Sequence, residues 1–155
     1  MTETNLILFD YNRDELKPLS FTRPVADIRI GIITIKEKWE QMTGIKASYH
    51  CVQYLATKFP IKYSQQNILI NSTILPTPEL CNYIKNGFPV NTLLIKNGVP
   101  IAIKTNTETA SQFLSGKISA PTTLESDLDF TQLSYPWDIF THNGTALKAD
   151  FDLLT

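Results

Sequence analysis

Glycine is scarce in this chain of 155 residues: there are six glycines, and the first of them is Gly31. A loop that binds phosphate through backbone amides needs glycine, because a residue without a side chain lets the main chain approach the phosphate closely. Neither GxGxxG nor GxxxxGK followed by Ser or Thr occurs in the sequence. These absences exclude the dinucleotide-binding fingerprint and the P-loop.

Cysteine and long apolar runs are also rare. Cys51 and Cys81 are the only cysteines and form no CxxC motif, so we expect both thiols to be reduced. No apolar run approaches the roughly 20 residues of a membrane-spanning helix. The N-terminal sequence MTETNLILFD lacks the basic start and the long apolar core of a signal peptide. We therefore expect a cytoplasmic protein without a membrane span.

Neither sign of charge dominates, since 14 basic and 15 acidic residues give a net charge of −1. This balance does not indicate a nucleic-acid-binding surface. Hydrophobic residues make up 43% of the chain and charged residues 19%, a composition typical of a folded core rather than of disorder. The length suits one globular domain, so we expect residues 1–155 to form a single domain.

Two short apolar runs, NLILFD at 5–10 and NILINSTIL at 67–75, predict strands buried on both faces, as in a parallel sheet covered by helices. The polar, proline-marked segment YNRDELKPLSFTRP follows the first run and is expected to form a long loop. A loop at the carboxyl end of such a strand commonly carries a ligand site.

Helix and turn signals fill most of the remaining chain. Thr34 and Glu37 form a capping box that predicts a helix at about 34–43, ended by Gly44. Asn97 and Gly98 predict a hairpin within TLLIKNGVPIAIKT. We expect further helices at 51–59, 77–87 and 107–116 and a loose connection at 117–134. Residues 135–154 are expected to form one helix, or two helices divided at Asn143–Gly144.

The order of strand, helix, strand, helix, hairpin and helices predicts an α/β, Rossmann-like layered fold. Its sheet is expected to be mostly parallel, with the β-hairpin added. The two tryptophans, Trp39 and Trp137, are expected to be packing anchors rather than stacking platforms for a base.

Basic side chains gather in the tract LSFTRPVADIRIGIITIKEKWE at 19–40. If phosphate binds after the first strand, side chains must replace the missing glycine amides. Arg23 and Arg29 can act as forks and Thr22 as a hydroxyl donor. Lys38 or Lys36 can act as a point charge.

Structural roles are open for the same residues. Arg23 can cap carbonyls or pair with Asp27, and the lysines at 36 and 38 can lie on the solvated face of a helix. Asp10, which ends the first strand, can hold a cation or a ligand hydroxyl, or it can open the loop as an Asx turn.

Two further pairs are weaker candidates. Asp138 and His142 are four apart on one helical face, where they can act as an acid and base pair or as two metal ligands. Asp138 can equally favour a helix N-terminus. His50 and Cys51 point to opposite faces of a strand, so they are not a ready ligand pair. No GxSxG elbow is present.

Three blocks carry a resemblance to a known family: PLSFTRPVADIRIGIITIKEKWE, INSTILPT at 70–77 and YPWDIFTHNGTALKADFDLL at 135–154. They resemble the N-terminal domain of a divergent bacterial family of sugar nucleotidyltransferases, over nearly the whole chain. In that family a left-handed β-helix acyltransferase domain normally follows. The complete proteins are described as UDP-N-acetylglucosamine diphosphorylase/glucosamine-1-phosphate N-acetyltransferase.

The resemblance implies a truncated nucleotidyltransferase fold that uses a nucleoside triphosphate such as UTP and a sugar 1-phosphate such as N-acetylglucosamine 1-phosphate. Mg²⁺ is the implied cofactor and pyrophosphate the second product. Thr22 and Arg23 match by position the threonine and arginine of the wider superfamily's signature loop. On that analogy Arg23 grips the triphosphate, and Arg29 or Lys38 replaces the lysine that contacts the phosphates.

The sequence also departs from that pattern. The loop glycines are missing, and INSTILP at 70–76 has no carboxylate where better-known members have a metal-binding Gly-Asp. Asp10 is the candidate replacement. The sequence ends at DFDLLT, where relatives continue into the β-helix, so the acyltransferase activity is not carried over. A catalytically degenerate module that binds a sugar nucleotide, or that associates with a β-helix acyltransferase, is the alternative expectation.

Overall fold

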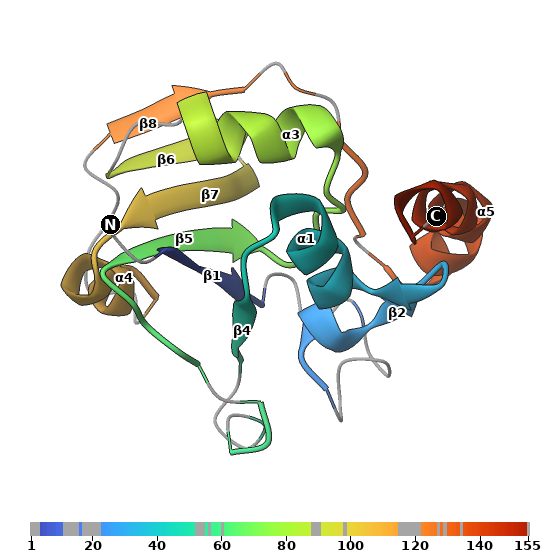
Figure 1. Ribbon diagram of the computed structural model, residues 1–155, viewed down its shortest axis with the longest axis horizontal. Helices are drawn as coiled ribbons and strands as arrows, with labels where there is room; N and C mark the ends of the chain where they lie inside the picture. Colours follow the sequence, from blue (N-terminus) through green and yellow to red (C-terminus); the bar gives the residue numbers. More distant parts are fainter. Residues whose placement is uncertain are drawn as a thin grey trace.

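A six-stranded sheet forms the centre of the protein, in the order β4-β1-β5-β7-β6-β8 (Figure 1). The computed structural model describes residues 4–10, 16, 23–51, 55, 57–59, 61–87, 91–97, 99–114, 122–126, 128, 130–133 and 135–154. The strands are β1 (Thr4–Phe9), β4 (Ala47–His50), β5 (Gln66–Asn71), β6 (Thr92–Lys96), β7 (Val99–Thr105) and β8 (Thr122–Glu125). Only β7 runs antiparallel to its neighbours, which confirms the mostly parallel sheet.

The central strands are buried on both faces, as the continuous apolar run in β1 predicts. Leu6 and Leu8 point into the larger core cluster, and Ile7 and Phe9 point into a smaller one on the other face. This alternation follows from the two-residue repeat of a strand. β1 is thus an interior strand, between β4 and β5, and its carboxyl end lies beside theirs.

Helices cover the two faces unequally. The larger cluster contains buried side chains of α1 (Ile35–Thr43), α3 (Pro78–Asn82), its continuation as the π-helical turn η3 (Tyr83–Gly87), and α5 (Pro136–Leu154). The smaller cluster receives α4 (Thr107–Leu114). A short 3₁₀ turn η2 (Val25–Asp27) and a two-stranded hairpin, β2 (Arg29–Ile30) and β3 (Ile33–Thr34), precede α1.

The local signals for α1 are confirmed. The Thr34 hydroxyl accepts the Glu37 N–H at 3.2 Å, and the Glu37 carboxylate accepts the Thr34 N–H at 3.1 Å. Gly44 ends the helix with a φ of 72°, in the left-handed region that favours glycine. The hairpin of β6 and β7 is also confirmed, with Asn97 at a φ of 51°.

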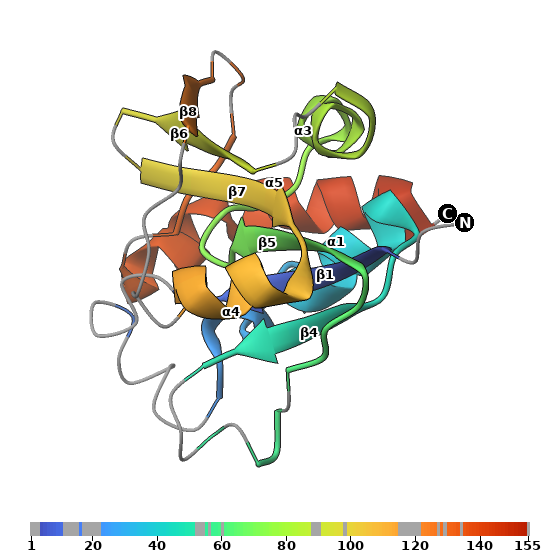
Figure 2. The same cartoon turned by 90° about the vertical axis from the view of Figure 1, so that its left-hand side faces the viewer.

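Two expectations are wrong, namely the loose connection at 117–134 and Trp137 as a packing anchor, whereas the single helix α5 and the buried Trp39 agree with the sequence analysis. The connection at 117–134 contains β8, an edge strand that pairs in parallel with β6. Helix α5 continues through Asn143–Gly144 without a break (Figure 2). Trp39 is fully buried and donates its indole N–H to the Ile74 carbonyl at 3.1 Å, whereas Trp137 is 59% exposed and stacks on Tyr135.

Two expected elements lie largely outside the described residues. These are the long loop after β1, of which residues 10, 16, 23 and 24 are described, and the helix at 51–59, of which residues 51, 55 and 57–59 are described. Across the described part of the chain, no helix is long and apolar enough to cross a membrane.

Candidate active site

The carboxyl ends of β1, β4 and β5 meet at one edge of the sheet. The backbone N–H of Asp10, just after β1, donates to the His50 carbonyl at the end of β4 at 3.0 Å. Ser72, just after β5, donates its N–H at 3.1 Å and its hydroxyl at 2.6 Å to the Phe9 carbonyl. The chain leaves β1 toward β4 on one side and leaves β5 toward β6 and β7 on the other. The boundary between β1 and β5 is therefore a topological switch point, where α/β sheets bind ligands.

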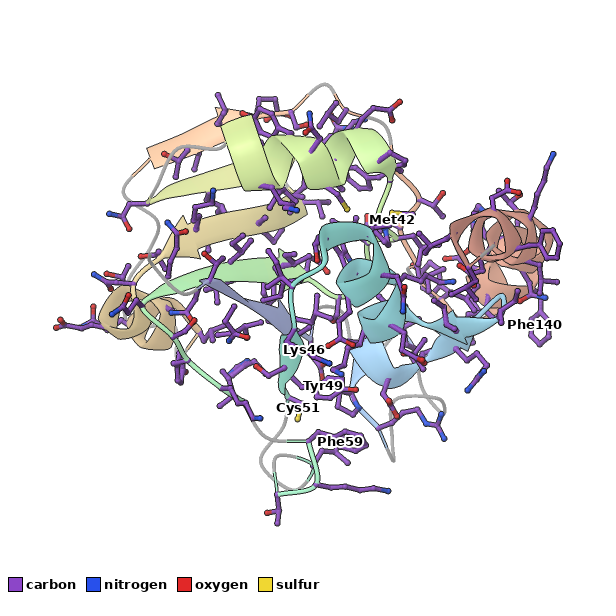
Figure 3. The ribbon with its side chains drawn as sticks, in the orientation of Figure 1. Met42, Lys46, Tyr49, Cys51, Phe59 and Phe140 are labelled. Atoms are coloured by element: carbon purple, nitrogen blue, oxygen red, sulfur yellow. The ribbon has the colours of Figure 1, made fainter. Side chains whose placement is uncertain are left out.

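Asp10 binds the segment that begins at Arg23 to this edge of the sheet. Its carboxylate accepts the Val25 N–H at 3.0 Å, which fixes the start of η2 against the end of β1. A second bond holds the other end of η2, since the Tyr49 hydroxyl on β4 donates to Asp27 at 3.2 Å (Figure 3). Burial, and then the neighbouring Asp27 carboxylate, raise the pKa of Tyr49, so the hydroxyl keeps the proton that it donates.

Arg23 lies two residues before Val25 and is exposed. The bond between Asp10 and Val25 therefore places Arg23 beside the switch point with its guanidinium accessible. Asp27 is occupied by Tyr49, and no ion pair joins it to Arg23, although both residues are described. Thr22, the expected hydroxyl donor, lies outside the described residues.

Arg29 belongs to a different part of this region. It is exposed on β2, and its guanidinium donates to the Ile32 carbonyl at 2.5 Å across the hairpin turn. The hairpin packs on α5 at the side of the molecule (Figure 1). Among the predicted site residues, the hydrogen bonds thus bring Asp10 and the Arg23 segment together, while Arg29 is held within its own hairpin.

Lys38 is not on a solvated helix face, and that interpretation is wrong for this residue. It is 4% exposed, and its ammonium forms a buried ion pair with Asp150 of α5. Burial lowers the pKa of Lys38 more than the bond to Asp150 raises it. Contact between Lys38 and a phosphate stays a prediction, and it requires this ion pair to open.

The segment after β5 is polar, but its side chains are buried and hydrogen-bonded within the protein. Asn71, Ser72 and Thr73 are fully buried. The Asn71 amide donates to the Pro100 carbonyl at 2.9 Å and accepts the Thr73 hydroxyl at 2.7 Å. These side chains hold β5 to its neighbours, so they build the edge of the site rather than offering groups to a ligand.

His50 ends β4 beside Asp10, and burial lowers the pKa of its imidazole. A folded state that prefers neutral His50 takes up fewer protons than the unfolded chain below the unfolded pKa of about 6.5. The free energy of unfolding should therefore fall as pH falls through that value.

We expect His50→Gln to reduce the loss of stability between pH 7 and pH 5, as measured by urea unfolding at each pH. Cys51→Ser changes the neighbouring side chain and keeps the imidazole, so it should retain the wild-type loss. An unchanged pH dependence in His50→Gln would show that other groups produce it.

The weaker candidates have structural positions. The Asp138 carboxylate accepts the Tyr135 N–H at 3.0 Å, which places it at the start of α5 as the alternative interpretation expected. Cys81 is buried, and burial raises the pKa of its thiol to about 12. Neither Cys51 nor Cys81 is in a disulfide, as predicted.

Comparison with known proteins identifies the family. A family model described as sugar nucleotidyl transferase matches residues 6–155. The chain belongs to the sugar nucleotidyl transferase family. The match begins within β1 and includes Asp10, the other strands of the sheet and α5, so it covers all three sequence blocks that carry the resemblance. No curated protein sequence matches the chain significantly.

Solved structures agree on the fold. A putative glucose-1-phosphate thymidylyltransferase from Bacillus anthracis, in complex with sucrose, is 8% identical with a TM-score of 0.52 and covers 94% of this chain and 95% of that one. A Mycobacterium sp. strain JC1 homolog of a Mycobacterium tuberculosis protein is 9% identical, covering 94% and 98%, with a TM-score of 0.45, too low to support an argument. The first likeness confirms an α/β, Rossmann-like nucleotidyltransferase fold.

Sugar nucleotidyltransferases generally use a divalent metal ion. Within the described residues, no three His, Cys, Asp or Glu side chains gather closely enough to hold one. Mg²⁺ bound together with substrate phosphates needs only one or two protein carboxylates, because phosphate oxygens and water complete its octahedron. That Asp10, at the end of β1, supplies this carboxylate stays a prediction; one of its carboxylate oxygens already accepts the Val25 N–H.

Proposed function

We propose that this protein transfers a nucleotidyl group from a nucleoside triphosphate to a sugar 1-phosphate and releases pyrophosphate. UTP and N-acetylglucosamine 1-phosphate are the substrates we propose first, on the resemblance of the FTRP tract. The observation that supports the proposal is the bond from Val25 to Asp10, which joins the segment that carries Arg23 to the carboxyl end of β1 in a nucleotidyltransferase fold. We further propose that residues 1–155 act as one domain of this type in the cytoplasm.

The reaction we propose is an in-line displacement at phosphorus. An oxygen of the sugar phosphate attacks the α-phosphorus, the bond from that phosphorus to the oxygen bridging the β-phosphate breaks, and the electron pair leaves with pyrophosphate. Negative charge grows on the leaving group, so an arginine fork near it stabilises the transition state. We assign this task to Arg23, with Thr22 as a hydroxyl donor and Arg29 as a second cation.

Mg²⁺, held by Asp10 and the substrate phosphates, would supply neutralisation of the triphosphate charge. The protein's own contribution is positional. Asp10 also holds Val25, and Tyr49 holds Asp27, so η2 is fastened at both ends before substrate binds. Because the backbone beside Arg23 is already held in place, little conformational entropy is lost there when the guanidinium binds the triphosphate.

A pyrophosphate-release assay tests this function. UTP, dTTP and other triphosphates should be offered with a panel of hexose and hexosamine 1-phosphates in the presence of Mg²⁺. Release with at least one pair is the expected result. No release with any pair, together with no metal-dependent nucleotide binding by calorimetry, would contradict an enzymatic role.

One observation favours a second function. Asn71, Ser72 and Thr73 at the end of β5 have no carboxylate, and they are buried and bonded to protein groups. A catalytically degenerate module that binds a sugar nucleotide, or that associates with a left-handed β-helix acyltransferase, is consistent with this loss. Nucleotide binding without pyrophosphate release in the same assay would select this function.

Arg23→Ala should separate binding from stability. A charge-assisted bidentate contact supplies a few kcal/mol, so kcat/KM is expected to fall roughly 10- to 100-fold. The exposed side chain makes little contribution to folding, so the melting temperature should change by no more than about 2 °C. Lys46→Ala, which also removes one exposed positive charge, should keep near wild-type activity.

A large drop in melting temperature for Arg23→Ala would indicate that this arginine is structural. Equal activity losses in Arg23→Ala and Lys46→Ala would indicate a general charge effect instead of a specific contact.

A further inference from the structure

Helix α5 exposes a row of large apolar side chains. Their exposed fractions are 59% for Trp137, 82% for Phe140, 42% for Leu147, 60% for Phe151 and 45% for Leu154. Figure 3 shows Phe140 projecting from α5 away from the sheet. We call these five residues, with Gly144 in the middle of the row, the outer stripe.

The outer stripe has the spacing of a coiled-coil seam. Positions 137, 140, 144, 147, 151 and 154 alternate steps of three and four residues, which places them along one side of an α-helix. Nothing lies within 4 Å of the point where a Cβ on Gly144 would sit, so the stripe is open at its centre.

A different side of α5 binds the rest of the protein. Ala146 and Asp150 are buried, and the Asn143 side chain accepts the Gly31 N–H at 2.8 Å. The fold's own packing therefore uses one side of α5, and the outer stripe is an additional apolar surface. A soluble monomer rarely exposes a continuous apolar patch of several hundred Å² without a binding role.

The stripe is large enough for a symmetric interface. Aromatic side chains bury about 150–250 Å² each, so the exposed fractions leave on the order of 500 Å² per copy, or roughly 1,000 Å² for a pair. Specific interfaces begin at about that total area. An isologous pair is also the simplest way in which one apolar stripe covers another.

We propose that α5 pairs with α5 of a second copy of this chain, antiparallel, about a two-fold axis between positions 145 and 146. That register places Trp137 opposite Leu154 of the second copy. It also places Phe140 opposite Phe151, and Gly144 opposite Leu147. Every position of the outer stripe meets another position of the stripe.

The sizes of the side chains in the outer stripe favour the antiparallel pair over a parallel one. In a parallel pair, Gly144 would face its own copy and leave a gap between layers of large side chains, which close-packed interfaces avoid. In the antiparallel pair, each Leu147 fills the space above a Gly144. A small residue therefore faces a large one in the two central layers, and no layer places two glycines together.

Sedimentation equilibrium tests the pairing. The wild-type chain is expected to be a dimer, and Phe140→Glu should raise the dissociation constant at least about 100-fold by placing a charge in an apolar layer. Thr145→Glu adds the same charge at an exposed position outside the stripe and should leave the dimer intact. Circular dichroism and urea unfolding should show that all three proteins are folded.

A wild-type chain that stays monomeric up to about 1 mM would overturn the proposal. A dimer that Phe140→Glu leaves unchanged would overturn it equally, since its interface would then lie elsewhere.

Cysteine cross-linking tests the direction, in a Cys51→Ser background where the remaining Cys81 is buried. A mixture of Phe140→Cys and Phe151→Cys chains should form a disulfide-linked pair on mild oxidation, because these positions face each other across the axis. Phe140→Cys alone should not. Linkage of Phe140→Cys with itself, or no linkage in the mixture, would overturn the antiparallel register.

Discussion

Asp150→Ala is expected to lower the free energy of unfolding by about 3–5 kcal/mol. Asp150 is 2% exposed and binds the buried ammonium of Lys38. The same carboxylate oxygen accepts the backbone N–H of Ile32 at 2.8 Å and of Ile33 at 3.3 Å. Alanine leaves a buried cation and two turn amides without an acceptor, and each carries a desolvation penalty.

Asp152→Ala is the matched control for this prediction. Asp152 is on the same helix, has the same charge and is exposed, so its loss should change stability by less than about 0.5 kcal/mol. Urea unfolding monitored by circular dichroism measures both variants. A loss in Asp150→Ala as small as that in Asp152→Ala would show that water reaches Lys38 and replaces the carboxylate.

Lys38→Met should cost less than Asp150→Ala. The carboxylate keeps two backbone donors after this change, and burial already opposes the charged ammonium, as the lowered pKa of Lys38 indicates. Removing a charge that is expensive to bury offsets part of the lost attraction. The reverse order of stability losses would mean that the ammonium, rather than the carboxylate, holds α5 to the hairpin.

Elements with local determinants were predictable from the sequence. The capping box of Thr34 and Glu37, the stop at Gly44 and the turn at Asn97 each depend on residues within a few positions of one another. The buried strands β1 and β5 also follow from continuous apolar runs. Local signals of this kind hold because backbone geometry and capping bonds decide them before tertiary packing acts.

Elements with distant determinants were not predictable. Strand β8 has the sequence TTLE, which shows no apolar alternation, and it is a strand because the edge of β6 offers it backbone partners. Gly144 does not break α5, since a single glycine costs a helix only about 1 kcal/mol. Packing of the rest of α5 on the hairpin and the core offsets that amount.

The candidate site likewise has a part that the sequence predicts and a part that depends on distant residues. The position of Asp10 and the return of the Arg23 segment follow from a polar loop after a buried strand. Lys38 could not be interpreted correctly, because its partner Asp150 is 112 residues away in sequence. An acidic residue on the inner side of a C-terminal helix gives no local sign that it binds a lysine of α1.

Gly31→Ala is expected to lower the free energy of unfolding by roughly 2–4 kcal/mol, through backbone strain and overlap together. Gly31 has a φ of 75°, which an L residue rarely adopts. A Cβ there would lie 2.6 Å from an Asp150 carboxylate oxygen and 2.8 Å from the Ala146 backbone. Helix backbone cannot move aside locally, so the hairpin and α5 must separate.

Gly44→Ala is the control that separates the steric overlap at Gly31 from the backbone strain of a positive φ. Gly44 has a nearly equal φ of 72°, and nothing lies within 4 Å of its missing Cβ, so alanine there meets only the backbone penalty of about 1–2 kcal/mol. The difference between the two variants in urea unfolding therefore measures how tightly the hairpin docks on α5. Equal losses would mean that the hairpin moves easily, and then Asp150 and Asn143 could not hold the β2–β3 hairpin that carries Arg29 in a fixed position on α5.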